Sequence, residues 1–351
     1  MRTLLLLILC AVSASAEGAW NFAVSGDSRN CGDVVMPAIA KKAAAKSAAF
    51  YWHLGDLRAT YKIDEDIARR NDQLASPLST EAYHAMEWTD FIEHEIKPFA
   101  MPFFVGIGNH ELIPPKSRED FVSTFSQWLD APVLKDQRLR DDPKSDASRT
   151  YYHWNKNGID FIFLDNASAE QFDSAQLSWF EGVLARDEAD AAIKTVVVGM
   201  HEALPQSISS NHSMDQSETG ETTGLRVYAD LLAAQNKFYK RVYVLASHSH
   251  FFMNGIFKTK YWREHGGVLP GWIVGTAGAV RYRLPPGSKF AKKAQTDVYG
   301  YLLGRAEPSG KIDFEFQPVA ETDIPDIVAA QYEPGLVHWC FAENTDIPTL
   351  Q

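Results

Sequence analysis

Short apolar segments along the chain each run into a loop of polar residues. These segments are rich in β-branched and aromatic residues and are too short for helices, so each predicts a strand that ends at a polar loop. They cover residues 20–25, 50–54, 102–107, 195–198 and 241–246. Further strands are predicted at residues 272–280, 300–305 and 311–316, with a hairpin over 151–164 that turns at 155–158.

Helical patterns alternate with these strands. Residues 34–49 are rich in alanine, residues 81–96 carry an apolar stripe, and 174–184 form a third segment with Asp173 as its predicted cap. Alternating strands and helices indicate βαβ units and an α/β fold. Ligands of such sheets gather beyond the carboxyl ends of the strands, and all the polar loops fall there. Residues 135–150 and 205–224 are expected to be surface loops.

The first 16 residues have the pattern of a cleavable signal peptide. Arg2 supplies a positive charge, residues 4–12 are apolar, and Ala14-Ser15-Ala16 matches the small-x-small cleavage pattern. The apolar run is shorter than the ~20 residues that a membrane-spanning helix needs. We therefore expect cleavage after Ala16 and a secreted or periplasmic protein without a membrane span. With no internal repeat or linker, residues 17–351 are expected to form a single domain with elaborated loops.

Composition and charge narrow the classes of function. Of the 351 residues, 45% are hydrophobic and 23% are charged, which predicts a folded chain with a sizeable core. The formal net charge of -11 disfavours general binding to nucleic acids or anionic membranes. Phosphate chemistry would have to be organised locally, by metals or a few cations. Oligomeric state is not constrained.

Removal of the leader leaves two cysteines, Cys31 and Cys340. In an oxidising compartment they could form a disulfide that closes a very long loop. They could equally be separate buried thiols, because the sequence does not give the distance between them.

The polar loops carry oxygen and nitrogen ligands without a thiolate. Such a set suits Fe, Mn, Zn, Co or Ni, and a shared carboxylate can bridge two cations ~3.5–4 Å apart. Each motif is weak by itself, but their order along the chain is informative. The candidate metal ligands are Asp27, Asp56, Asn109, His201, His248 and His250.

This ordered set resembles the calcineurin-like metallophosphoesterase superfamily, which includes purple acid phosphatases. Gly108-Asn109-His110-Glu111 is its most specific element, and the resemblance covers residues ~20–280. It implies two packed mixed β-sheets flanked by helices, a four-layer α/β/β/α sandwich. It also implies hydrolysis of phosphoric esters with two metal ions.

The resemblance assigns a role to each ligand. Asp56 would bridge both ions, Asp27 and His250 would hold the first, and the second would be held by Asn109, His201 and His248. His110 would lie beside the leaving group and assist its departure without binding metal.

One position departs from the family pattern. Most members have Asp-x-His in the first motif, whereas here Arg29 replaces the metal-binding histidine. Purple acid phosphatases compensate with a tyrosine at a position that is Ala59 here. A guanidinium cannot act as a ligand, so we expect the first ion to bind weakly. Arg29 could bind substrate phosphate, point away from the site, or mark a site that no longer turns over.

These observations predict an exported metal-dependent phosphoesterase. A metal-bound hydroxide would attack phosphorus in a small phosphoester, with Arg29 and His110 as catalytic residues. Two alternatives remain: a non-catalytic protein that binds a ligand or partner on the same scaffold, and a metal-dependent hydrolase of a non-phosphorus ester or amide. Specificity is expected to reside in residues 57–100, 112–150 and 205–224, and the choice between monoester and diester stays open.

Overall fold

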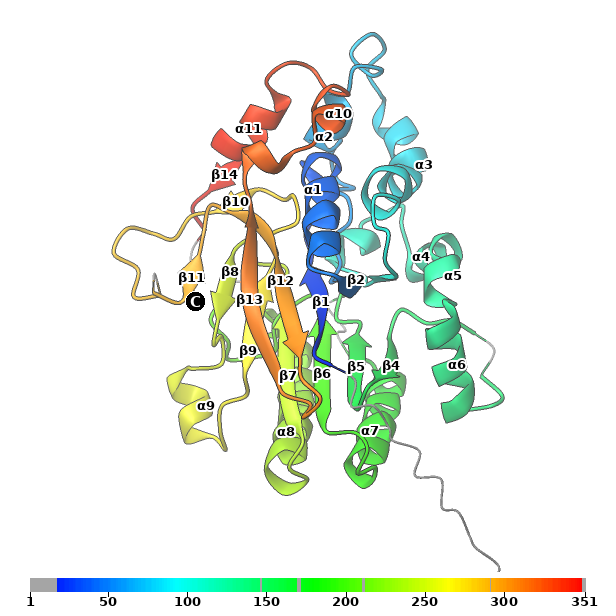
Figure 1. The fold of residues 1–351 in the computed structure, drawn as a ribbon, viewed down its shortest axis with the longest axis vertical. Helices are drawn as coiled ribbons and strands as arrows, with labels where there is room; N and C mark the ends of the chain where they lie inside the picture. The colour runs from blue at the N-terminus through cyan, green and yellow to red at the C-terminus, as the bar shows by residue number, and fades with distance from the viewer. Residues whose placement is uncertain (1–17, 146, 169–171, 210–211, 291, 349–351) are drawn as a thin grey trace, which may run out of the picture.

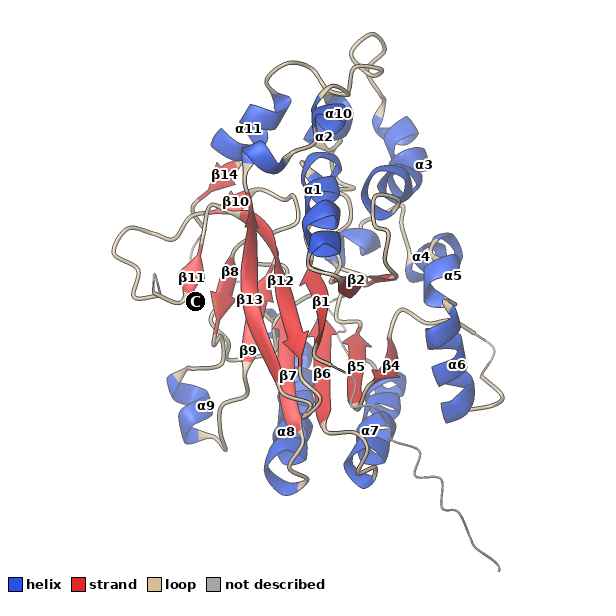
Figure 2. Cartoon of the chain, viewed as in Figure 1, coloured by secondary structure: helices blue, strands red, loops and turns tan. Residues whose placement is uncertain are grey.

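A computed structural model describes residues 18–348 except 146, 169–171, 210–211 and 291. Two β-sheets pack face to face and helices cover their outer faces (Figures 1 and 2). The strands of the first sheet, in spatial order, are β13 (Ile312–Val319), β12 (Tyr299–Ala306), β1 (Trp20–Ser25), β2 (Ala48–His53) and β3 (Phe103–Val105). The β1, β2 and β3 strands run parallel, and β12 and β13 are antiparallel additions from the C-terminal part of the chain.

The second sheet is also mixed. Its strands, in spatial order, are β11 (Ala294–Gln295), β8 (Phe252–Asn254), β9 (Gly271–Val274), β7 (Arg241–Ala246), β6 (Thr195–Met200), β5 (Ile159–Leu164) and β4 (Tyr152–Lys156). The β5, β6, β7 and β9 strands are parallel, while β4, β8 and β11 pair antiparallel. A short pair, β10 (Arg281–Tyr282) with β14 (Thr345–Asp346), lies beside the sheets.

Helices complete the four predicted layers. The longest are α1 (Gly32–Ala45), which packs on the first sheet, and α7 (Ser174–Ala189) and α8 (Glu218–Lys237), which pack on the second. The other α-helices are α2 (Glu65–Ala68), α3 (Thr80–Phe91), α4 (Arg118–Thr124), α5 (Ser126–Leu129), α6 (Pro132–Asp141), α9 (Lys260–Glu264), α10 (Asp326–Ala329) and α11 (Leu336–Ala342). The predicted two-sheet α/β sandwich is therefore confirmed.

Aromatic contacts join the two sheets. Phe22 on β1 and Phe50 on β2 both pack against Phe161 on β5, with ring centroids 5.2 and 5.1 Å apart. Alternation along each strand points these rings into the shared core, where aromatic pairs contribute beyond simple area burial. The contact fixes how the two sheets lie against each other. It thereby sets the distance between the loops that leave β1 and β2 and those that leave β6 and β7.

Most predicted elements are present with small shifts of their ends. The strand predicted at 272–280 is an exception: it ends at Val274, because the Ala277 and Ala279 amides that follow donate to the Gly26 and Asp27 carbonyls of the loop after β1. The predicted strands all form, and so does the hairpin of β4 and β5. Asp173 caps α7 by accepting a hydrogen bond from the Gln176 amide at 2.7 Å. The predicted second helix changes at Ile92–Ile96 into a π-helix.

Two predicted loops are in part helical. Helix α6 includes residues 135–141 of the loop predicted at 135–150. Its exposed charged side chains carry no periodic apolar signal, so the sequence pattern did not predict it. Residues 205–224 contain a 3-10 turn, Met214–Gln216, and the first turns of α8. Ser217 caps α8 by accepting from the Gly220 amide at 2.9 Å, so this serine marks a helix start within a polar stretch.

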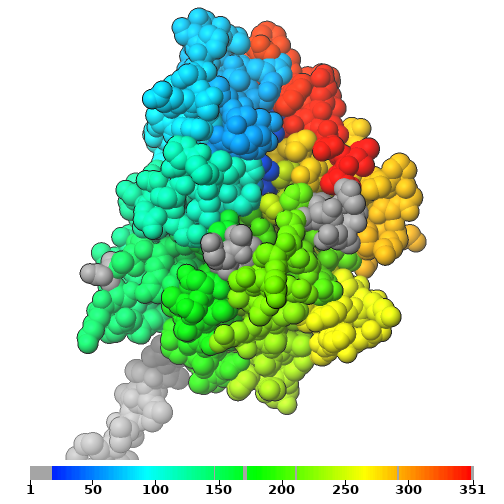
Figure 3. Space-filling model, turned by 180° about the vertical axis from the view of Figure 1, so that it is seen from behind, coloured from blue at the N-terminus to red at the C-terminus, as the bar shows by residue number. Residues whose placement is uncertain are grey.

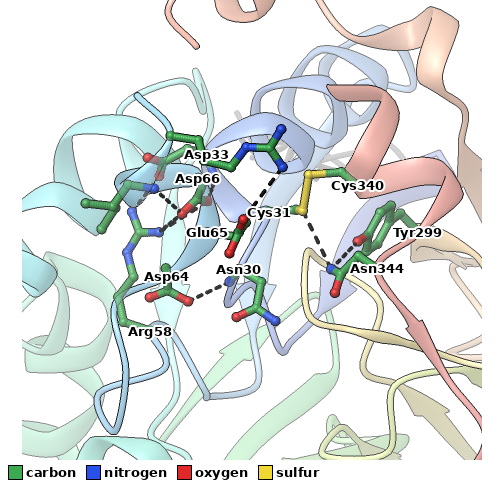
Figure 4. The surroundings of a disulfide bond; sticks show 12 residues. Asn30, Cys31, Asp33, Arg58, Asp64, Glu65, Asp66, Tyr299, Cys340 and Asn344 are labelled. Atoms are coloured by element: carbon green, nitrogen blue, oxygen red, sulfur yellow. Dashed lines mark hydrogen bonds and ion pairs between the residues drawn. A yellow bond between two sulfur atoms is a disulfide. The ribbon is translucent and has the colours of Figure 1, made fainter. Parts of the chain in front are cut away.

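Cys31 and Cys340 form a disulfide, which decides between the two alternatives left by the sequence. Figure 4 shows Asn344 beside it, donating to the Tyr299 hydroxyl at 2.9 Å. The bond ties α11 to the start of α1. Figure 3 shows the C-terminal segment, in red, lying against both the blue residues that follow β2 and the gold residues near β10.

The predicted signal peptide lies outside the described residues. Within the part of the chain that is described, no helix combines the length and apolar character needed to cross a bilayer.

Removing the disulfide should destabilise the fold. The bond joins residues 309 positions apart, so the Cys31→Ser/Cys340→Ser variant regains chain entropy when it unfolds. We expect the free energy of unfolding to fall by ~2–5 kcal/mol, measured by urea denaturation. Wild-type protein in reductant should match the variant. Equal stability of oxidised and reduced wild type would contradict this role.

Candidate metal centre

Loops from both sheets meet at one end of the sandwich. The Gly26 amide donates to the Val274 carbonyl at 3.1 Å, and the Asp27 amide donates to the Gly55 carbonyl at 3.0 Å. Gly55 has φ +95°, and a Cβ there would lie 2.5 Å from the Gly108 nitrogen. Only glycine therefore lets the loops after β2 and β3 approach this closely. The junction brings all the predicted site residues together.

Four of the predicted ligands converge on one point. The Nε2 atom of His201 lies 2.9 Å from His248 Nδ1, 3.0 Å from Asn109 Oδ1 and 3.3 Å from Asp56 Oδ1. More widely, ligand atoms of Asp27, Asp56, His201 and His248 all lie within 4.8 Å of one another. These side chains come from both sheets, so the fold itself assembles the cluster.

The His201 imidazole is oriented to bind a cation at this point. His201 Nδ1 donates to the Leu54 carbonyl at 3.0 Å, which turns Nε2 toward the cluster, as in metal-binding histidines. Burial disfavours the imidazolium, but Asp56 raises the pKa of His201 to about 10. A metal ion binding to Nε2 must displace this proton. The set of one carboxylate, one amide oxygen and two imidazoles thus fits a divalent ion.

The group predicted to hold the first ion contains a guanidinium. Arg29 Nη2 donates to His250 Nε2 at 2.7 Å, while Arg29 Nε lies 3.5 Å from Asp56 Oδ2. The same Nη2 is 4.0 Å from Asp27 Oδ1. Arg29 is 8% exposed, so it points into the site and not away from it. The residues present at this position do not fit an ion alongside the arginine.

His110 also contacts Arg29. Its Nδ1 donates to the Ala59 carbonyl at 2.6 Å, and its Nε2 accepts from Arg29 Nη1. Burial and the nearby Arg29 charge outweigh the opposite effect of Asp56 and lower the pKa of His110. His110 is therefore a neutral imidazole that orients the guanidinium.

Side chains without a predicted role hold the ligands in place. Glu111 accepts amide hydrogen bonds from Asp56, Leu57 and Gly108 at 2.7–2.9 Å and so joins two ligand loops. Asn166 Oδ1 accepts from the His201 amide at 3.1 Å. Two sequence signals could have found them: Glu111 belongs to the most specific motif, and Asn166 lies just after the end of β5.

Backbone conformation also sets the site. Asp27, Asp56 and His248 have φ of 60°, 59° and 64°, which non-glycine residues rarely adopt. Such conformations persist only where the surroundings enforce them, and they gather at functional sites. Here the Asp27 carboxylate holds the backbone of His248 in place, because its Oδ2 accepts hydrogen bonds from the Ser247 hydroxyl and from the His248 amide.

An open cleft of about 590 Å³ leads to the cluster. Residues from two of the segments predicted to control specificity line it, including Tyr61, Lys62 and His212. Among the described residues, none from 112–150 does so. No sequence motif indicated Tyr282 or Trp339, which line the cleft from regions outside the ligand motifs.

Three further histidines have contacts other than those of the candidate ligands. His53 supports the second loop by accepting from the Gly55 amide at 3.2 Å. His153 is structural, held between Asp141 and Asp160. The His212 ring packs against His248 with centroids 4.5 Å apart.

Comparisons with known proteins identify the fold. The match to the structure of PhoD covers 87% of this chain and 72% of the PhoD chain, at 14% identity and with a TM-score of 0.53. The match to a dimetal phosphatase from Danio rerio covers 86% of this chain and 97% of the phosphatase, at 12% identity and with a TM-score of 0.52. The match to purple acid phosphatase PPD1 from yellow lupin (Lupinus luteus) seeds covers 88% of this chain and 55% of PPD1, at 13% identity and with a TM-score of 0.51.

The chain therefore has the calcineurin-like metallophosphoesterase-type fold that its motifs indicated. No family model matches the sequence, and a search of curated proteins also finds no match.

Asn166→Ala should weaken metal binding without unfolding the chain. The asparagine fixes the backbone of His201, and loss of such a supporting group typically costs ~10–100-fold in metal affinity. Asn166→Asp keeps the acceptor and should retain most of the affinity. Calorimetric titration with Mn²⁺ measures the difference, and circular dichroism checks the fold. Equal affinity of Asn166→Ala and wild type would contradict the assignment.

Proposed function

We propose that this chain is an exported metal-dependent phosphoesterase. The observation that carries the proposal is the convergence of Asp56, Asn109, His201 and His248 at the base of a cleft. A divalent ion held there supplies a Lewis acid that polarises a phosphoryl oxygen and activates water. The phosphatases that share the fold support the same reaction class.

The other residues of the cleft suit an anionic substrate. Arg29 lines the cleft and uses one N–H of Nη1 and one of Nη2 on His110 and His250. Each of these nitrogens carries a second N–H, so the guanidinium can donate to a phosphoryl oxygen. The cleft volume suits a small phosphoester.

For His110 we propose a role that differs from the expected assistance to the leaving group. Because its Nδ1–H is committed to Ala59, its Nε2 accepts from Arg29. We assign Arg29 to stabilise the departing oxygen with its charge, and His110 to hold Arg29 in the required orientation.

Export and a single domain are parts of the same proposal. The leader pattern of residues 1–16 supports export, and the Cys31–Cys340 disulfide suits an oxidising compartment. The disulfide and the β1–β12 pairing both join the two ends of the chain, which supports a single domain over residues 17–351.

A second candidate function is favoured by one observation. Arg29 hydrogen-bonds His110 and His250. In a two-metal phosphatase these histidines would instead assist the leaving group and hold the first metal ion. A scaffold that binds a phosphorylated ligand without hydrolysing it would make the same contacts. Metal-loaded protein that binds phosphate but turns over no phosphoester would favour this function.

Removal of a central ligand should abolish turnover. Asp56→Ala and His201→Ala remove atoms from the convergent cluster, so both metal content and hydrolysis of aryl phosphates should be lost. His110→Ala should retain metal but lower kcat by ~10²-fold, since it disorients Arg29. Steady-state assays of chromogenic monoesters and diesters with added Mn, Fe, Zn, Ni or Co, together with elemental analysis, measure both effects.

Exposed residues provide matched controls for these variants. Asp136→Ala and His265→Ala change the same residue types on the surface and should behave as wild type. Inorganic phosphate should inhibit competitively if the enzyme is a phosphoesterase. A carboxylic ester hydrolase is not expected to show this inhibition. Intact aryl phosphatase activity in Asp56→Ala would contradict the site assignment.

A further inference from the structure

The Arg29 guanidinium lies among the atoms that the family resemblance assigns to the first metal ion. It donates to His250 Nε2 and faces Asp27 Oδ1 and Asp56 Oδ2. These two carboxylate oxygens are fully buried and accept no hydrogen bond from any described residue. Arg29 therefore supplies the positive charge at the very place where a cation would be expected.

An ion and this guanidinium are mutually exclusive. A ligand nitrogen must approach a metal ion to ~2.0–2.1 Å with a free lone pair. The Nε2 lone pair of His250 is already used by Arg29 Nη2 at 2.7 Å, because His250 Nδ1 donates to the Val280 carbonyl. The guanidinium keeps its proton and offers no lone pair in return.

The backbone on both sides of Arg29 is fixed. The Ser28 amide donates to the Asp56 carbonyl at 3.1 Å, and the Asn30 amide donates to Asp64 Oδ1 at 2.6 Å. Asn30 has φ 70°, and the next residue, Cys31, is in the disulfide (Figure 4). With its backbone held and histidine acceptors on two sides, Arg29 cannot leave the site at low cost.

We propose that this centre binds a single metal ion, at Asp56, Asn109, His201 and His248, and that the Arg29 guanidinium permanently replaces the first ion of a two-metal centre. This inference rests on the metal centre of the proposed function. The replacement leaves one fixed unit charge where a divalent ion would bring two.

Metal stoichiometry tests the replacement. After loading with Mn²⁺ and dialysis, wild type should retain a single ion per chain, with an electron paramagnetic resonance spectrum free of exchange coupling. Arg29→His restores an imidazole where the family pattern has one, and it should bind a second ion coupled to the first. Arg305→His places the same new side chain on the exposed surface and should keep the wild-type count.

A second pair of variants does not depend on the new histidine. His248→Ala should lose the ion, whereas His250→Ala should retain it, since His250 contacts Arg29 and not the ion. Two retained ions in wild type, or loss of the ion in His250→Ala, would overturn the proposal. A folded Arg29→His protein that still binds a single ion would overturn it as well.

Turnover plays no part in this count, so the two proposals can fail separately. A single bound ion without hydrolysis of any phosphoester would contradict only the proposed function. Two bound ions with phosphoesterase activity would contradict only the replacement. Wild type that binds no ion would contradict both.

Discussion

Two fully buried carboxylates, Asp27 and Asp56, constrain the rest of the site. Buried charges are tolerated only when they are paired and hydrogen-bonded. Asp27 is held by Ser247 and the His248 amide, and Asp56 by the His110 amide at 3.0 Å. One oxygen of each remains without a hydrogen bond from the described residues and requires a cation. The sandwich thus encloses a concentration of negative charge that positive groups must balance.

The two sheets meet this requirement together. Asp27 and Asp56 follow strands of the first sheet, whereas His201 and His248 follow strands of the second. Aromatic packing between the sheets fixes their separation, and left-handed backbone at Asp27, Asp56 and His248 turns the side chains inward. Such backbone costs ~1–3 kcal/mol at each position, and the surrounding contacts offset it. Fold stability and site geometry are therefore coupled.

Sequence reasoning located the strands and the polar residues that converge at the site, because both leave local signals. Trp20–Ser25 and Arg241–Ala246 are predicted to the residue, and the polar loops follow them directly. Helices α6 and α8 were partly missed because a proline in the first turn of α6 and a serine cap on α8, not apolar periodicity, mark their starts. Tyr282 and Trp339 line the cleft through long-range packing, which no local pattern records. The sequence identified Cys31 and Cys340 as a possible disulfide pair but could not show that the bond forms, because that depends on the distance between them.

In the proposed centre, Arg29 is a single side chain that would change the chemistry of the site without changing the fold. A histidine at this position would add a ligand and leave the buried carboxylates to a second ion. Arginine instead brings its own charge, pairs with His110 and His250, and ties the balance of charge to the folded chain. Because that charge cannot dissociate, this half of the site is complete whenever the protein is folded. In the proposed single-ion centre, only the other half would depend on the supply of metal, and a substrate would meet one exchangeable cation and one fixed hydrogen-bond donor.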